Sequence, residues 1–134
     1  MEVHVNYLAV LVAAIAEYAL ATVWYAFLFG ALWKKLTGIE EMKPSLGKMA
    51  TVFVGALLTS YVLLHSIVFG NAYVNMSGVS GGLMGGFFSW LGFIAPITMT
   101  SVIYEKRPWK LWALDNGFWL LSLLIMGAIL SAWQ

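Results

Sequence analysis

Four long apolar stretches constrain the fold of this chain more than any other feature of its sequence. They are 21 to 23 residues long and cover residues 7–29, 49–69, 83–104 and 111–133. About 20 residues of α-helix, rising 1.5 Å per residue, span a hydrocarbon core of roughly 30 Å. Each stretch can therefore cross a lipid bilayer once as a helix. The short alternating segments of a membrane β-barrel are not seen.

The composition supports a single membrane domain. Hydrophobic residues make up 62% of the 134 residues and charged residues 10%, whereas soluble proteins typically have roughly 45–50% and about 25%. These values exclude a soluble enzyme, and the length leaves room for one compact unit. We therefore predict an all-α fold, a four-transmembrane-helix bundle over residues 1–134, with the lipid bilayer as its surroundings.

The distribution of basic residues predicts the orientation of the bundle. All seven lie between the first and second stretches or between the third and fourth: Lys34, Lys35, Lys43, Lys48, Lys106, Arg107 and Lys110. Cytoplasmic loops are enriched in Lys and Arg, so we expect both basic loops in the cytoplasm and both termini on the outer side of a cell inner membrane. The net charge of only +1 argues against a nucleic-acid partner.

The third stretch carries a proline and a face of small residues. Pro96 cannot donate a hydrogen bond to the carbonyl of Gly92, so a kink is predicted near Pro96. Small residues spaced three and four apart let membrane helices approach closely. The predicted packing face consists of Gly78, Gly82, Gly85, Ser89 and Gly92. Packing within the monomer, a subunit interface and a lipid or cofactor groove all fit this face, and we expect a homo-oligomer.

Glu17 lies near the middle of the first stretch. An intramembrane carboxyl is costly and usually faces the bundle interior, where it marks a proton site, an ion path or a buried polar network. Without a matched cation it is expected to be neutral, because ionising it there costs several kcal/mol. The candidate partners at comparable depth on the second stretch are Thr59, Ser60 and Tyr61.

Asp115 and Asn116 form a second polar pair, about one and a half turns into the fourth stretch. Snorkelling lysines can reach this depth, and Lys48 and Lys110 are candidate counter-ions for a structural anchor. The pair can instead belong to a polar vestibule on the cytoplasmic side. Other residues expected at that level are Thr98, Thr100 and Ser101.

No cofactor, metal or catalytic site is expected. Cysteine is absent, which excludes thiolate metal sites and disulfides. His4 and His65 are isolated imidazoles near the outer boundary, so interfacial hydrogen bonding is favoured over a haem or metal site. An enzyme is not favoured. Two functions remain: binding or conduction of a small solute or proton around Glu17, and a structural or accessory subunit without transport or catalytic activity of its own.

Several short motifs rich in aromatic residues accompany the four stretches. They are Asn6-Tyr7-Leu8-Ala9, Trp24-Tyr25 followed by Phe29-Gly30 and Trp33, Trp90-Leu91-Gly92-Phe93, and Glu105-Lys106-Arg107-Pro108-Trp109. Together they resemble the bacterial membrane family called domain of unknown function 1761, over about residues 6–133. The resemblance implies a compact four-helix integral membrane protein and no particular activity. Relatives often have Ser-Pro after the Trp-Tyr pair, where this chain has Ala26-Phe27.

The last of these motifs predicts an anchor at the inner interface. Glu105 and Arg107 are expected to pair near the headgroups, and Trp109 is expected to anchor the fourth helix, because Trp prefers the headgroup level. This structural role is favoured over catalysis.

Overall fold

The computed structural model describes residues 3–40 and 43–134, and these residues form helices and connections without a strand. In chain order the elements are α1 (Tyr7–Thr22), η1 (Val23–Leu28), α2 (Gly30–Thr37), α3 (Leu46–Val74), α4 (Gly78–Ser89), η2 (Trp90–Ile94), α5 (Ala95–Tyr104) and α6 (Trp109–Ala132), where η marks a π-helical segment. Four continuous helical units are long and apolar enough to cross a membrane: Tyr7–Leu28, Leu46–Val74, Gly78–Tyr104 and Trp109–Ala132. The predicted all-α, four-span fold is confirmed.

Local capping sets the ends of the second span. The hydroxyl of Ser45 accepts a hydrogen bond from the Lys48 backbone N–H at 3.2 Å, which satisfies one of the free donors of the first turn. Asn75 ends the helix with a left-handed backbone, φ 57°. Because these caps lie outside the most apolar residues, α3 is longer than the predicted stretch of residues 49–69.

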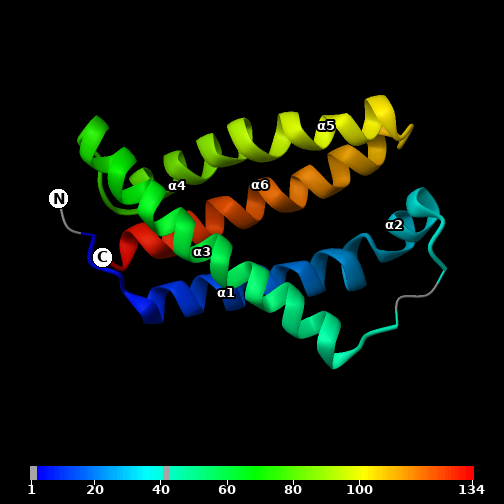
Figure 1. Cartoon of the computed structure of the whole chain (residues 1–134), viewed down its shortest axis with the longest axis horizontal. Coiled ribbons are helices and arrows are strands. Elements are labelled where there is room, and N and C mark those ends of the chain that lie inside the picture. The colour runs from blue at the N-terminus through cyan, green and yellow to red at the C-terminus, as the bar shows by residue number, and fades with distance from the viewer. Residues whose placement is uncertain (1–2, 41–42) are drawn as a thin grey trace.

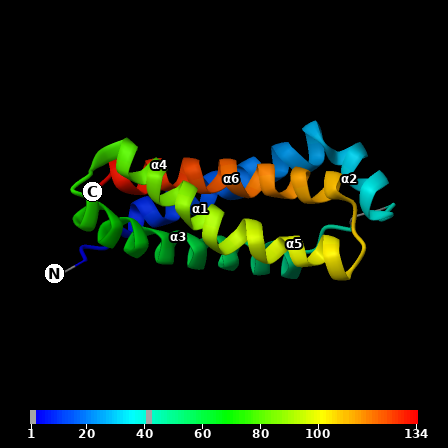
Figure 2. The ribbon, with the colours of Figure 1, turned by 90° about the horizontal axis from the view of Figure 1, so that it is seen from above.

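The helix α6 is the centre of the bundle. It contacts α1, α2, α3, α4 and α5, while α3 crosses α1 obliquely on one side (Figure 1). The two chain ends lie at one end of the bundle with the α3–α4 connection, and the α2–α3 and α5–α6 connections lie at the other (Figures 1 and 2). Both basic loops are therefore at the same end of the molecule.

The break predicted in the third span takes the form of the π-helical segment η2. The Ala95 N–H bonds to the carbonyl of Trp90, five residues back, and Ile94 has φ −110°. Pro96 follows in the first turn of α5, where its missing N–H is tolerated. The lost hydrogen bond at Pro96 is thus accommodated by widening the preceding turn.

A second break interrupts the first span, and no proline causes it. The Phe29 N–H bonds to the carbonyl of Trp24 at 2.8 Å, and Phe29 leaves helical geometry with φ −122° and ψ 14°. A Cβ at Gly30 would lie 2.7 Å from the carbonyl oxygen of Tyr25. Glycine therefore allows the chain to pass close to that carbonyl and to begin α2.

The closest helix contact joins α4 to α6. A Cβ at Gly82 would collide with the carbonyl of Gly127, and one at Gly86 would collide with the carbonyl of Leu123. A side chain at Gly127 would in turn collide with Gly82. The two backbones touch through these glycines, which is the geometry expected of small-residue contacts between membrane helices.

The contact face differs in part from the predicted set. Gly85 packs against the Ile67 side chain of α3, whereas Gly78 and Gly92 have open space where a Cβ would be. Gly78 has a left-handed backbone, φ 65°, at the start of α4. Gly92 lies inside η2, where the π-helical repeat replaces the regular three-and-four spacing.

Candidate functional site

Glu17 is buried in the core, with 7% of its surface exposed. Its Oε2 atom has no hydrogen-bond partner among residues 3–40 and 43–134. The proposed partner Ser60 is also buried, but its hydroxyl donates to the carbonyl of Val10 at 2.9 Å. The expected Glu17–Ser60 pairing is therefore absent from the described part of the chain, because Ser60 lies at the level of a residue two turns earlier on α1.

The register of α1 against α6 identifies the level of Glu17 more closely. Two side-chain hydrogen bonds to backbone carbonyls set this register, Asn6 Nδ2 to Trp133 at 2.8 Å and Trp24 Nε1 to Leu114 at 3.2 Å. Glu17 is eleven residues after Asn6, and Ser122 is eleven residues before Trp133. Glu17 thus lies at the depth of the buried Ser122. This level is in the packed core.

A polar cluster surrounds Asp115 near the other end of the bundle. The Tyr25 hydroxyl donates to Asp115 Oδ1 at 2.6 Å, which attaches η1 to α6. The Tyr25 ring packs edge-on against Phe118 and Trp33. The sequence alone does not assign Tyr25 or Trp24 to this site. The signal in the sequence was the Trp-Tyr motif, which by itself does not show which helix it contacts.

Asn116, the neighbour of Asp115, is held in a separate network. It is 2% exposed and donates to the Trp112 carbonyl and to Thr98 Oγ1, both at 3.0 Å. Its Oδ1 accepts from Trp90 Nε1 at 3.1 Å, and Trp112 Nε1 contacts Thr98 Oγ1 at 3.0 Å. This network joins η2 and α5 to α6, so Asn116 is a structural connection.

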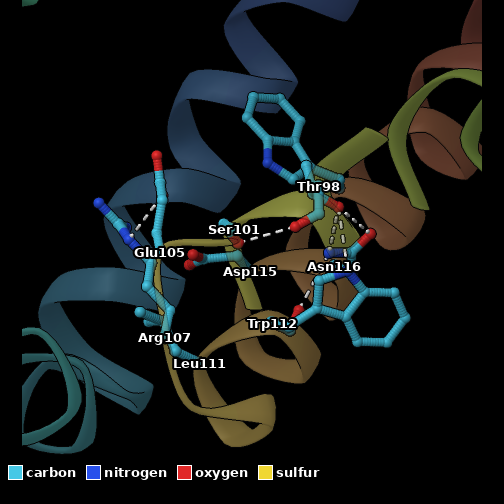
Figure 3. A pocket seen from close by; sticks show the side chains of 9 residues that line it. Thr98, Ser101, Glu105, Arg107, Leu111, Trp112, Asp115 and Asn116 are labelled. Atoms are coloured by element: carbon cyan, nitrogen blue, oxygen red, sulfur yellow. Dashed lines mark hydrogen bonds and ion pairs between the residues drawn. The ribbon is translucent and has the colours of Figure 1, made fainter. Parts of the chain in front are cut away.

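Two pockets adjoin Asp115. The Asp115 pocket has a volume of about 250 Å³, and its lining consists of Thr98, Ser101, Glu105, Arg107, Leu111, Trp112, Asp115, Asn116 and Trp119. The Trp33 pocket has a volume of about 310 Å³, and its lining consists of Trp33, Leu36, Thr37, Ile39, Arg107, Leu111 and Asp115. Figure 3 shows Ser101 and Asp115 in the middle of the Asp115 pocket, between Glu105 with Arg107 and the cluster of Asn116.

The charged groups of the Asp115 pocket favour a cation. Arg107 Nε pairs with Glu105 Oε2 at 3.3 Å, and both side chains are more than half exposed. With all three groups ionised, two carboxylates and one guanidinium leave one negative charge in the lining. Neither Lys48 nor Lys110, the expected counter-ions of Asp115, belongs to either lining. The Nζ atom of Lys48 instead lies 3.5 Å from the Lys43 carbonyl.

The remaining candidate residues lie elsewhere. Thr59 is half-buried on α3, and the Thr100 hydroxyl donates to the Ile97 carbonyl. Trp109 is exposed, with its ring edge-on to Trp112. His65 Nδ1 lies 2.9 Å from the Tyr61 carbonyl, one turn earlier on α3. Among the expected vestibule residues, only Thr98 and Ser101 join Asp115 and Asn116 in the pocket lining.

The aromatic motifs of the sequence meet at this site. Trp24 and Tyr25 contact α6 beside Asp115, Trp90 contacts Asn116, and Trp33 and Arg107 line the pockets. A family model described as "Protein of unknown function (DUF1761)" matches residues 8–131. Comparisons with curated proteins and with solved structures gave no match. The family match covers nearly the whole of the four-helix fold, and the chain therefore belongs to the DUF1761 family of proteins of unknown function.

Proposed function

We propose that the protein binds a small organic cation, an amine, in the Asp115 pocket. The observation that carries this proposal is the Asp115 carboxyl, which accepts one hydrogen bond from Tyr25 and forms part of a pocket lining that contains two carboxyl groups and one guanidinium. A carboxylate held in place by a hydroxyl presents its remaining lone pairs to a ligand without reorganisation. An ammonium group supplies the donors and the charge that match it.

Aromatic rings in the lining support the same ligand class. Trp112 and Trp119 line the Asp115 pocket, and the face of an indole ring attracts a cation within about 6 Å of its centre. The volume of about 250 Å³ lies below the roughly 300–1,000 Å³ of drug-sized ligand sites. A ligand with a few carbon atoms around its ammonium group fits these properties.

The site lies at the end of the bundle that carries both basic loops. Since such loops are enriched on the cytoplasmic side, we place the pocket opening toward the cytoplasm of a cell whose inner membrane holds the protein. Binding of the amine from this side would be the first step of either its transport across the membrane or its sensing.

Amine binding can be measured with the purified protein in detergent. Titration of butylammonium chloride, followed by tryptophan fluorescence and calorimetry, is expected to show saturable binding, with butanol as the uncharged control. Asp115→Asn keeps the size and the acceptor for Tyr25 but removes the charge, so affinity should fall about tenfold or more. Glu40→Gln, an exposed carboxyl outside both linings, should change nothing. Equal amine affinity of Asp115→Asn and the unmodified protein would refute the proposal.

A second candidate is binding or conduction of a proton or solute at Glu17. It rests on the buried Oε2 atom without a hydrogen-bond partner among the described residues. Glu17→Gln should then fold normally and abolish pH-dependent flux into proteoliposomes, while Asp115→Asn retains that flux. If the protein is instead a structural or accessory subunit, neither variant should change binding or flux.

A further inference from the structure

The two pockets share one wall, and this wall carries the Asp115 carboxyl and the Arg107 guanidinium. Arg107, Leu111 and Asp115 belong to the lining of the Asp115 pocket and of the Trp33 pocket. Leu111 and Asp115 are one turn apart on α6, and Arg107 precedes this helix in the α5–α6 connection. A ligand that occupies both pockets would therefore meet a carboxylate and a guanidinium along the same wall.

Arg107 has donors left for such a ligand. Its pairing with Glu105 uses the Nε atom, whereas a guanidinium has four further N–H donors on its two terminal nitrogens. These donors match the oxygen atoms of a phosphate in a bidentate arrangement. The side chain is more than half exposed, so a phosphate can reach it without displacing buried groups.

The Trp33 pocket differs from the Asp115 pocket in its remaining lining. Its apolar surface comes from Trp33 and Leu36 of α2 and from Ile39, which follows α2. Exposed Tyr104 and Trp109 lie at the same end of the bundle, and such residues are typical of the headgroup level of a membrane. The two pockets therefore combine a polar, charged part with an apolar part at the depth of lipid headgroups.

We infer that the ligand of this site is a zwitterion with an ammonium group and a phosphate, in the form of an aminophospholipid headgroup. The ammonium lies at Asp115, the phosphate lies at Arg107, and the glycerol and first acyl carbons lie against the apolar surface of the Trp33 pocket. This inference rests on the proposed amine binding at Asp115 and extends it to the phosphate, to Arg107 and to a lipid source.

The test compares soluble probes on the purified protein in detergent. Dihexanoyl phosphatidylethanolamine carries both groups, dihexanoyl phosphatidylglycerol lacks the amine, glycerophosphoethanolamine lacks the acyl chains, and butylammonium lacks the phosphate. The unmodified protein is expected to bind the first about tenfold more tightly than each of the others. Phosphatidylglycerol and butylammonium each lack one charge-assisted contact, which contributes about 1.4 kcal/mol or more. Glycerophosphoethanolamine lacks the acyl carbons that would contact the apolar surface of the Trp33 pocket.

Two variants separate the two charges. Arg107→Gln should lower the affinity for dihexanoyl phosphatidylethanolamine about tenfold and leave butylammonium binding no weaker. Asp115→Asn should remove the preference for phosphatidylethanolamine over phosphatidylglycerol. Lys106→Gln, which changes a neighbouring cation outside both linings, should leave all four affinities unchanged.

The outcomes distinguish this inference from the proposed function. Unchanged phosphatidylethanolamine affinity in Arg107→Gln would overturn the phosphate assignment, while amine binding that depends on Asp115 would still stand. If glycerophosphoethanolamine binds as tightly as the short-chain lipid, the zwitterion assignment holds and the lipid source is wrong. If butylammonium binding does not depend on Asp115, both proposals fail.

Discussion

Asp115 and Asn116 are adjacent in the chain but have different surroundings. Consecutive residues of an α-helix point about 100° apart, so one side chain faces η1 and the other faces η2 and α5. The Asn116 amide donates to Thr98 and to the Trp112 carbonyl and accepts from Trp90. Asp115 accepts one hydrogen bond from Tyr25 and lines two pockets. Asn116 is therefore a structural connection, and Asp115 is the residue at which we propose that the ligand binds.

The Tyr25 hydroxyl is expected to stabilise the fold through Asp115. Tyr25→Phe removes a hydrogen bond of 2.6 Å to a carboxyl, a type of contact worth roughly 1.5–3 kcal/mol when the acceptor is charged. The thermal midpoint in detergent should fall by several degrees. Tyr18→Phe is the matched control, since the Tyr18 ring packs edge-on against Phe53 and keeps this contact without its hydroxyl. Equal midpoints of the two variants would contradict a stabilising role of the bond.

Glu17 is expected to cost stability in this fold. A buried polar atom without a partner is destabilising by roughly 1–3 kcal/mol. Glu17→Met, of similar size and apolar, should therefore raise the thermal midpoint, whereas Glu17→Gln should change it less. A clear drop in stability for Glu17→Met would mean that the carboxyl makes a favourable contact in the bilayer.

At the scale of the helices, two π-helical segments bring the site together. The segment η1 carries Trp24 and Tyr25 to α6, and η2 begins with Trp90, which bonds to Asn116. In both places the chain leaves regular α-helical geometry within a membrane-spanning unit. The freed backbone groups bond five residues back, so that the segments remain hydrogen-bonded where water is scarce.

The glycine contact between α4 and α6 gives a prediction at the same scale. In Gly82→Ala the new methyl group meets the backbone carbonyl of Gly127, so the helices must separate. Overpacking of this kind costs typically 1–3 kcal/mol, and the thermal midpoint should fall accordingly. Gly92→Ala, with open space at the Cβ position, should be neutral or slightly stabilising. Similar losses in the two variants would contradict the contact explanation, because Ala has a higher helix propensity than Gly and a Cβ at position 92 meets open space.

The whole molecule has two chemically different ends. Both connections with Lys and Arg lie at one end, and the chain ends lie at the other (Figure 2). We predict that the basic end faces the cytoplasm. In this cysteine-free chain, Ser77→Cys should react with an impermeant thiol reagent applied to intact cells, and Lys43→Cys should react only after permeabilisation. The reverse pattern would invert the topology.

The expected homo-oligomer is a second prediction for the whole molecule. Gly82 and Gly86 contact α6 of the same chain, so an assembly would have to use other surfaces. Light scattering of the protein in detergent, corrected for bound detergent, should give a multiple of 14.8 kDa. A mass of one chain at micromolar concentration would exclude a stable oligomer.

Hydrophobic length in the sequence was enough to predict the four helices, and Pro96 was enough to predict the break in the third span. Depth along the helices placed Thr98, Thr100 and Ser101 at the level of Asp115 and Asn116, and the structure brings Thr98 and Ser101 into the same pocket lining as the pair. These features depend on local composition, because each membrane helix must satisfy its own backbone and bury its own apolar length. Only the tertiary structure decided which polar groups meet. The Tyr25–Asp115 bond joins residues 90 positions apart, and the burial of Glu17 without Ser60 depends on the register between helices. That register arises from side-chain packing across helices, a non-local property that periodicity along one chain does not contain.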